Sequence, residues 1–109
     1  MSKLVPIDAR SLALRLEASE VTLIDIREPG EFAQEHVEGA ACVPLSRLNS
    51  GDAKVRSAIP VVFTCKTGMR TGANCNQLAA HVGEPAYVLE GGLEAWKKAG
   101  FAIARRGRT

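Results

Sequence analysis

The sequence contains few cysteines, and their arrangement excludes two kinds of small domain. The chain has three, Cys42, Cys65 and Cys75, an odd number without a Cys-x-x-Cys pair. A disulfide framework needs cysteines that pair, and a structural zinc site needs closely spaced ligands, so we expect neither. His36 and His81 do not lie at a ligand-like distance from a cysteine pair. We therefore expect no metal, and cysteines that stay reduced point to the cytoplasm.

The sequence also lacks long apolar runs and a large excess of either charge. No apolar run approaches the roughly 18 residues of a membrane span, and the N-terminus has no signal-peptide pattern. The net charge of +2 gives no reason to expect nucleic acid or a membrane surface as a partner. We interpret the basic residues at the C-terminus as a solvated tail.

The amount of apolar material fits one small domain. The chain has 109 residues, of which 46% are hydrophobic, so a single core can form without disulfide or metal staples. There is no repeat, low-complexity tract or linker to divide it. We predict one domain over residues 1–109, with a core from about 4 to 104 and a basic tail over 105–109.

Apolar runs and turn residues alternate along the chain in a way that predicts strands and helices in turn. The expected strands are 3–7, 21–26, 41–43, 60–64 and 86–89. The expected helices are 9–18, a short one from 28, 71–82 and 93–99, with short helical pieces in 45–58 around a turn at 49–51. This alternation predicts an α/β domain with a mostly parallel sheet.

Several residues have expected places within these elements. Pro6 indicates an edge strand, and Asp8 is expected to cap the first helix. Gly91-Gly92 is expected to close the last strand. The apolar side of the first helix is expected to contain Leu12, Leu14 and Leu16, and the inner side of helix 71–82 to contain Ala73, Leu78, Ala79 and Val82.

Cys65 stands at the end of the clearest buried strand, before a short loop and a helix start. Sites in open α/β sheets form beyond the carboxyl ends of the strands, and a helix start favours an anion. Gly68 can turn its amide inward, and Lys66 and Arg70 add positive charge. These groups favour the thiolate form of Cys65, which is the nucleophilic form.

The alternative is that Cys65 is an inert core cysteine, as free cysteines usually are. The Gly, Lys and Arg around it argue against that interpretation, because a core cysteine does not need them. Cys75, in the following helix, could act as a resolving thiol for Cys65, but we favour a packing role. Mass spectrometry after mild peroxide would separate the two. Cys42, in a short apolar strand, is expected in the core.

Three blocks of the sequence together resemble the rhodanese superfamily over nearly the whole chain. The first block is Leu23-Ile24-Asp25-Ile26-Arg27 with Glu31-Phe32 and His36-Val37-Glu38-Gly39-Ala40. The second is the loop Cys65-Lys66-Thr67-Gly68-Met69-Arg70-Thr71, and the third is Leu89-Glu90-Gly91-Gly92-Leu93-Glu94-Ala95-Trp96. The resemblance implies a rhodanese-like domain with a five-stranded, mostly parallel sheet flanked by helices.

The resemblance also implies a catalytic Cys65 that carries a persulfide, with no cofactor. The amides from Lys66 to Thr71 would ring the sulfur, and the Thr71 hydroxyl could hydrogen-bond to it. The implied substrate-binding residues are Lys66, Thr67, Gly68, Met69, Arg70, Thr71 and Arg27.

For other residues in the matching blocks we favour structural roles. Arg27 is expected to pair with a carboxylate such as Glu31 rather than to contact substrate. Asp25 is expected to fix the turn at its strand end, and His36 to bond to backbone nearby. Trp96 is expected to anchor the last helix in the core.

The loop length separates two chemistries within this resemblance. Four residues lie between Cys65 and Arg70, as in sulfur-transferring members, whereas related phosphatases and arsenate reductases have five. The sequence therefore predicts a thiosulfate sulfurtransferase. Its partners would be a small anionic sulfur donor and a thiol or cyanide acceptor. The alternatives are a non-catalytic rhodanese-like binding module and, less favoured, a phosphatase or arsenate reductase.

Similar single-domain members also occur fused to a pair of transmembrane helices. Residues 105–109 come before any such segment, and basic residues before a span would suit the cytoplasmic face. A domain cut from a longer membrane protein is therefore one alternative. We favour a complete stand-alone protein.

Overall fold

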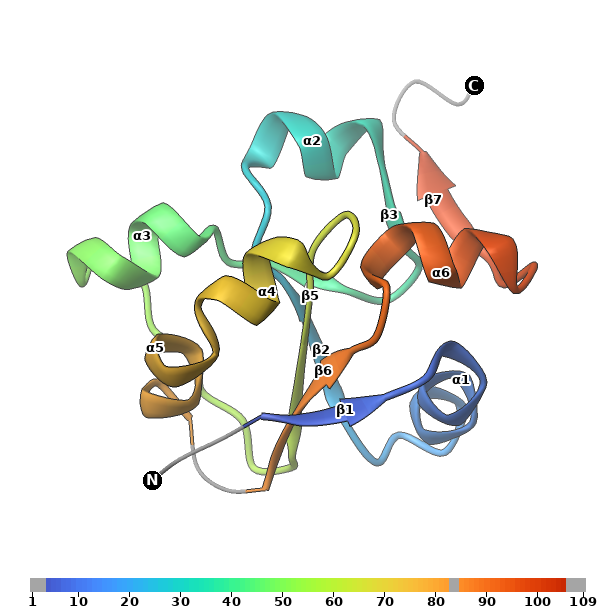
Figure 1. Cartoon of the computed structure of the whole chain (residues 1–109), viewed down its shortest axis with the longest axis horizontal. Helices are drawn as coiled ribbons and strands as arrows, with labels where there is room; N and C mark the ends of the chain where they lie inside the picture. Colours follow the sequence, from blue (N-terminus) through green and yellow to red (C-terminus); the bar gives the residue numbers. More distant parts are fainter. Residues whose placement is uncertain (1–3, 83–84, 106–109) are drawn as a thin grey trace.

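The computed structural model describes residues 4–82 and 85–105, without the side chains of Arg70 and Cys75. Its strands are β1 (Val5–Ile7), β2 (Thr22–Asp25), β3 (Glu35–Val37), β4 (Ala41–Cys42), β5 (Val61–Thr64), β6 (Ala86–Leu89) and β7 (Ile103–Arg105). Its helices are α1 (Ala9–Glu17), α2 (Pro29–Gln34), α3 (Leu45–Ser50), α4 (Met69–Ala73), α5 (Cys75–Ala80) and α6 (Gly92–Lys98). Figure 1 shows their arrangement.

The main sheet has five strands in the order β1-β6-β5-β2-β4, and all of its neighbouring strands run parallel. The α/β prediction is therefore confirmed. β5 lies at the centre, and all four of its residues are buried. The continuous apolar runs that predicted β2 and β5 reflect this burial, because a parallel sheet is covered on both faces. Pro6 lies on the edge strand β1, as expected.

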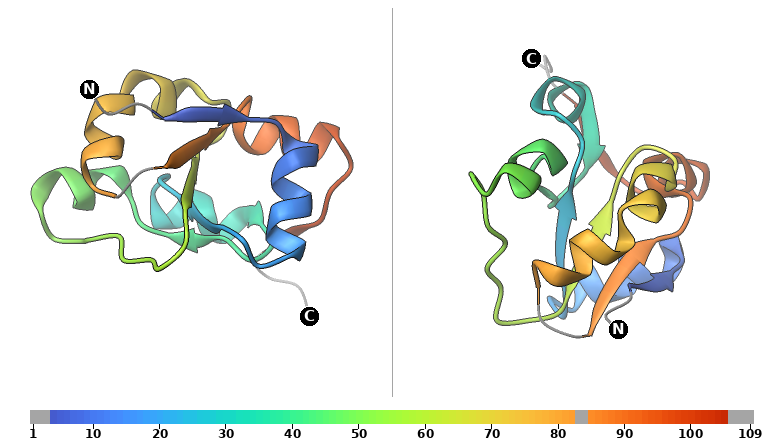
Figure 2. Two further views of the ribbon diagram at one scale, coloured as in Figure 1. Left: turned by 90° about the horizontal axis from the view of Figure 1, so that it is seen from below. Right: turned by 60° about the vertical axis from the view of Figure 1, so that its left-hand side comes forward.

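Helices cover both faces of the sheet and give the domain two halves of its core (Figure 2). On one face, α1 and α6 supply Leu12, Leu93 and Trp96. On the other face, α3 and α5 supply Leu48 and Leu78. The loops at the carboxyl ends of the central strands therefore stand on a scaffold that is packed from both sides.

A second, two-stranded sheet was not predicted. β3 and β7 pair antiparallel, with Glu35 opposite Arg105. The Glu35 carboxylate also receives a hydrogen bond from Lys97 Nζ over 2.8 Å, which ties this sheet to α6. Arg105, which we assigned to the tail, is the last residue of β7; the rest of the predicted tail, 106–109, lies outside the described residues.

The helix predicted over 71–82 was wrong in its boundaries and in one inner residue. It begins earlier, at Met69, and is divided into α4 and α5 at Asn74, whose backbone leaves the helical region with a φ of −119°. The division changes the helix phase, so Ala73 is exposed, whereas Leu78 and Ala79 are buried as predicted.

Two other predictions near the surface also need correction. Leu14 is 63% exposed, because on α1 it lies away from the buried Leu12. Residues 45–58 contain one helix, α3, which ends at the left-handed Gly51 (φ 84°), and no further helix before β5. Asp8 caps α1 as predicted, accepting a hydrogen bond from the Ser11 amide over 2.7 Å.

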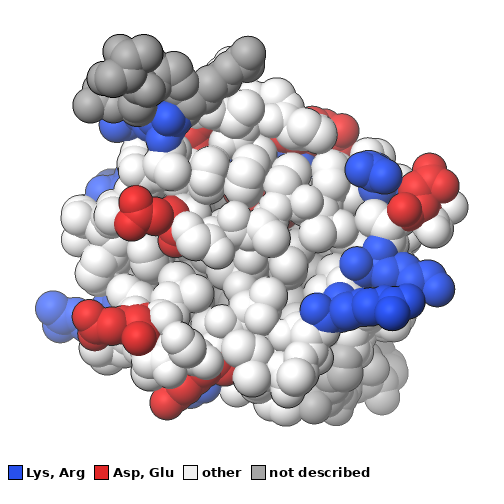
Figure 3. Space-filling model, turned by 180° about the vertical axis from the view of Figure 1, so that it is seen from behind, with Lys and Arg blue, Asp and Glu red and all other residues white. Residues whose placement is uncertain are grey.

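The surface seen from behind carries its charges mainly toward the rim, and the middle of that face is largely uncharged (Figure 3). Within residues 4–82 and 85–105, no helix combines the length and the apolar character needed to cross a membrane.

Candidate active site

Cys65 directly follows the central strand β5, at the carboxyl edge of the parallel sheet. This is the edge at which sites form in open α/β folds. The residue is only 1% exposed. Its side chain is therefore covered by the surrounding residues.

Gly68 brings a hydrogen-bond donor to this sulfur. Its amide nitrogen lies 3.2 Å from Cys65 Sγ. Its φ of 90° is in the left-handed region, which glycine adopts without strain. Gly68 is also the N-cap of α4, so the contact places the sulfur at a helix start, as the sequence predicted.

Thr71 also contacts the sulfur. Its Oγ1 is 3.7 Å from Cys65 Sγ and donates a hydrogen bond to the carbonyl oxygen of Gly68 over 3.0 Å. The residue is fully buried. When Cys65 is a thiol, its S–H can donate to Thr71; when Cys65 is a thiolate, the Thr71 hydroxyl can turn to donate to it.

The remaining predicted loop residues form the rim of the site. Lys66 and Thr67 are exposed, and Met69 is 78% exposed. The backbone of Arg70 belongs to α4, and its side chain lies outside the described set. The loop thus brings Cys65, Gly68 and Thr71 together and leaves Lys66, Thr67 and Met69 facing outward.

The first turn of α6 supports the loop from outside, and this support was missed in the sequence. The Leu93 amide donates to the Cys65 carbonyl oxygen over 2.8 Å, and the Glu94 amide donates to the Lys66 carbonyl oxygen over 2.9 Å. The available signal was Gly91-Gly92 directly after a predicted strand. We interpreted that pair only as the end of the strand.

Arg27 lies in a buried ion pair whose carboxylate is that of Asp25. Nε and Nη2 of Arg27 donate to the Asp25 carboxylate over 3.0–3.1 Å, and the Arg27 amide donates to it over 3.0 Å. Nη2 also donates to the Glu35 carbonyl oxygen over 2.6 Å. Arg27 thus pairs with a carboxylate, as expected, but the carboxylate is that of Asp25 and not that of Glu31. With 3% of Arg27 exposed, this geometry favours a structural role over contact with a substrate.

The interpretations of Asp25, His36 and Trp96 agree with their contacts. Asp25 holds the turn after β2 through the Arg27 amide. His36 Nδ1 hydrogen-bonds with the Phe32 carbonyl oxygen at 2.7 Å, and the two rings stack 3.7 Å apart. Trp96 is buried and donates from Nε1 to the Ala102 carbonyl oxygen over 2.8 Å.

Comparison with known proteins decides the family. The profile of the Rhodanese-like domain matches residues 8–99. The chain belongs to the rhodanese-like domain family.

Relatives of this rhodanese-like domain include proteins with and without an assigned activity. An uncharacterized protein of Synechocystis is 38% identical over 101 residues, covering 93% of this chain and 56% of that protein. A protein of Tolumonas auensis named thiosulfate sulfurtransferase GlpE is 30% identical over 97 residues, covering 89% of this chain and 92% of that one. A rhodanese-related protein from Thermoplasma volcanium has the same fold, with a TM-score of 0.78 at 23% identity, over 92% of this chain and 97% of that chain.

The chain spans somewhat more than half the length of two curated relatives. It covers 56% of the Synechocystis protein and 59% of an uncharacterized protein of Bacillus subtilis. Relatives that it covers almost entirely carry sulfurtransferase names, including one from Allochromatium vinosum at 32% identity. The family therefore includes members that carry sulfurtransferase names.

The other cysteines of this rhodanese-like domain differ from Cys65 in their surroundings. Cys42 is half-buried, with its Sγ 3.6 Å from the Arg27 carbonyl oxygen. Burial, and then the negative charge of Asp25, raise the pKa of the Cys42 thiol above its ordinary value of 9.0. Cys42 is thus only partly in the core. The side chain of Cys75 lies outside the described set, so its resolving or packing role stays a prediction.

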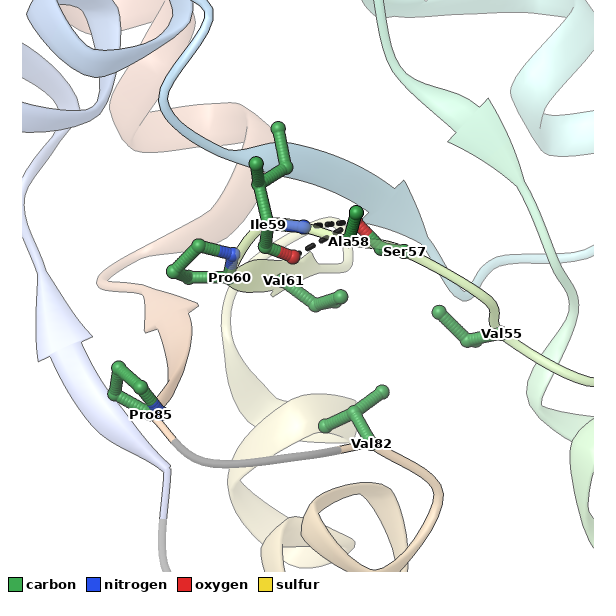
Figure 4. A pocket seen from close by; sticks show the side chains of 8 residues that line it. All are labelled: Val55, Ser57, Ala58, Ile59, Pro60, Val61, Val82 and Pro85. Atoms are coloured by element: carbon green, nitrogen blue, oxygen red, sulfur yellow. Dashed lines mark hydrogen bonds between the residues drawn. The ribbon is translucent and has the colours of Figure 1, made fainter.

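A hollow of about 310 Å³ lies at the amino ends of β5 and β6, away from Cys65 (Figure 4). Its lining is mainly aliphatic: Val55, Ser57, Ala58, Ile59, Pro60, Val61, Val82 and Pro85. The Ser57 hydroxyl donates to the Ile59 carbonyl oxygen over 2.7 Å and accepts from the Ile59 amide. Among residues 4–82 and 85–105, its lining holds no cysteine, histidine or charged residue. The candidate site around Cys65 lies at the other end of β5, which Cys65 directly follows.

Proposed function

We propose that the chain transfers a sulfane sulfur from thiosulfate or a similar donor to cyanide or a thiol, with Cys65 as the catalytic residue. The observation that carries this proposal is the closeness of the Cys65 sulfur to both the Gly68 amide and the Thr71 hydroxyl. Donors at these places stabilise negative charge on sulfur, and such dipoles count most in a site that excludes water.

The proposed reaction is a double displacement. The Cys65 thiolate attacks the outer sulfur of thiosulfate, a sulfur–sulfur bond forms, and the original one breaks as sulfite leaves with its electron pair. Cys65 then carries a persulfide. Cyanide attacks the outer sulfur and leaves as thiocyanate, or a thiol takes that sulfur as its own persulfide, and the Cys65 thiolate returns.

The other loop residues have supporting parts in this proposal. Lys66, exposed at the rim, would attract the anionic donor. Thr67, Met69 and Arg70 would border the approach to the sulfur. The four residues between Cys65 and Arg70 support a cradle of the size of a sulfur atom rather than one for a tetrahedral oxyanion. The free thiols of Cys42 and Cys65 support a reducing compartment such as the cytoplasm.

The test is the mass of the Cys65 peptide after treatment with thiosulfate. We expect an increase of one sulfur atom, lost again on adding cyanide with release of thiocyanate. Cys65→Ser should fold and have no activity, whereas Cys42→Ser should keep both the added sulfur and the turnover. A Cys65 that acquires no sulfur, or a Cys65→Ser variant with substantial activity, would contradict the proposal. If Cys65 acquires no sulfur in a folded chain, the result would favour the non-catalytic binding module. Hydrolysis of an aryl phosphate by the chain would favour the phosphatase.

A further inference from the structure

The peptide groups that follow Cys65 are held by the backbone of another element. The carbonyl oxygens of Cys65 and Lys66 accept hydrogen bonds from the Leu93 and Glu94 amides, over 2.8 and 2.9 Å. Leu93 and Glu94 belong to the first turn of α6, where amides have no partner within their own helix. In a trans peptide the N–H points opposite to the C=O. The amides of Lys66 and Thr67 are therefore directed away from α6.

Gly92 allows the two segments to approach this closely. A Cβ at this position would lie 2.5 Å from the Cys65 carbonyl oxygen and 2.8 Å from the Lys66 carbonyl carbon. Both are backbone atoms, which cannot turn aside as a flexible side chain can. Gly92 also has a φ of 58°, and a Cβ on Gly68 would lie 3.2 Å from the Gly91 nitrogen. The loop and the turn before α6 thus make contact backbone to backbone.

We propose that Gly92 is a positioning residue: with the Leu93 and Glu94 amides, it fixes the Cys65–Gly68 backbone so that the loop stabilises the Cys65 thiolate. A side chain at position 92 pushes the Cys65 and Lys66 carbonyls away from α6. The peptide groups then rotate, and the Gly68 amide leaves its 3.2 Å contact with Cys65 Sγ. The proposal relies on the proposed function only for Cys65 being a nucleophile.

The first test compares Gly92→Ala with Gly100→Ala. Gly100 has a similar left-handed conformation, with φ 86°, but a Cβ there meets nothing within 4 Å. An alanine at either position is thus strained by the left-handed backbone, but only Gly92→Ala displaces the loop after Cys65. The measurement is the rate at which iodoacetamide alkylates the Cys65 peptide, by mass spectrometry, from pH 6 to pH 10, because the thiolate is the reacting form.

We expect Gly92→Ala to react about tenfold more slowly than the unchanged chain at pH 7 and to approach its rate at pH 10, since a hydrogen bond to a charged group is lost. Gly100→Ala should follow the unchanged chain at every pH. A folded Gly92→Ala variant with an unchanged pH profile would overturn the proposal.

A second pair of variants tests the amides if Gly92→Ala does not fold. Glu94→Pro removes the donor to the Lys66 carbonyl oxygen at a position in the first helical turn, where proline is tolerated. Glu94→Ala removes the same exposed carboxylate and keeps the amide. Slower alkylation at pH 7 in Glu94→Pro alone supports the proposal, and equal rates in both contradict it. Alkylation is read without sulfur transfer, so failure of the proposed function would show in the persulfide experiment and leave this comparison intact.

Discussion

The Arg27 guanidinium binds both carboxylate oxygens of Asp25, and neither side chain is more than 4% exposed. Through Nη2, Arg27 also holds the Glu35 carbonyl oxygen at the start of β3. The pair thus joins the end of β2 to the second sheet. Breaking a buried pair from one side leaves an uncompensated charge in the interior.

Replacing Arg27 by alanine is therefore expected to lower the free energy of unfolding by about 3–5 kcal/mol. Urea denaturation measures this. Asp25→Asn and the variant with both substitutions complete a double-mutant cycle. We expect the loss of stability in the double variant to be smaller than the sum of the losses in the two single variants. A stable Arg27→Ala variant that uses thiosulfate poorly would instead place Arg27 among the substrate-binding residues.

Thr71 offers a test of the hydroxyl beside the sulfur. Thr71→Val keeps the shape, removes the donor to the Gly68 carbonyl oxygen and costs about 1 kcal/mol of stability. We expect turnover to fall by roughly 3–10-fold, because the negative sulfur loses one potential donor. Thr71→Ser, which retains the hydroxyl, should restore most of the rate. If valine and serine variants turn over equally fast, the hydroxyl has no part in the reaction.

Lys66 is expected to act on the encounter with an anionic donor rather than on the chemical step. Lys66→Ala should raise KM for thiosulfate about two- to fivefold, with little change in kcat, and should weaken the salt dependence of kcat/KM. Lys54→Ala is the matched control, since Lys54 is also exposed but lies in the segment before β5, whereas Cys65 follows that strand. An unchanged KM in Lys66→Ala would rule out the steering role.

Glu35 makes stability depend on pH in a predictable direction. The hydrogen bond from Lys97 lowers the pKa of Glu35 below its ordinary value of 4.5. The stability that ionised Glu35 contributes is therefore complete at pH values above its ordinary pKa. It is lost as the pH falls through the lower pKa that Glu35 has in the folded chain. In the Glu35→Gln variant the side chain at position 35 does not titrate, so this variant serves as the reference.

The unchanged chain should exceed the Glu35→Gln variant in free energy of unfolding by up to about 1 kcal/mol at pH 7, as for a partly exposed pair. The difference should narrow as the pH falls below 4.5 and through the lower pKa that Glu35 has in the folded chain. Urea titrations of both chains at each pH provide the measurement. A constant difference from pH 7 to pH 3 would mean that the ion pair with Lys97 contributes nothing.

Features encoded locally were predictable from the sequence. The apolar runs around Leu23 and Val62 predicted buried strands because strands covered on both faces need them. The loop of the candidate site was predictable because Cys65, Gly68 and Thr71 lie within seven consecutive residues. The cap at Asp8 depends on a residue three positions away, so it too is visible in the sequence.

Features made by distant segments were not predictable in the same way. The pairing of β3 with β7 joins residues far apart, and each of the two strands is only three residues long. The closeness of Gly92 to Cys65 depends on how α6 packs. Leu14 illustrates a further limit, because an apolar residue on a helix can lie on either side of the boundary between core and surface.

The support that α6 gives the loop has a consequence for the order in which the site is made. During synthesis Cys65 leaves the ribosome before Gly92, and at about 5–20 residues per second the interval is on the order of seconds. Until then the backbone around Cys65 lacks its hydrogen bonds with α6. Strand β1 also lacks its neighbour β6, since Val5 pairs with Tyr87. The nascent chain therefore passes through a period in which Cys65 lacks the cover that leaves it only 1% exposed in the folded domain.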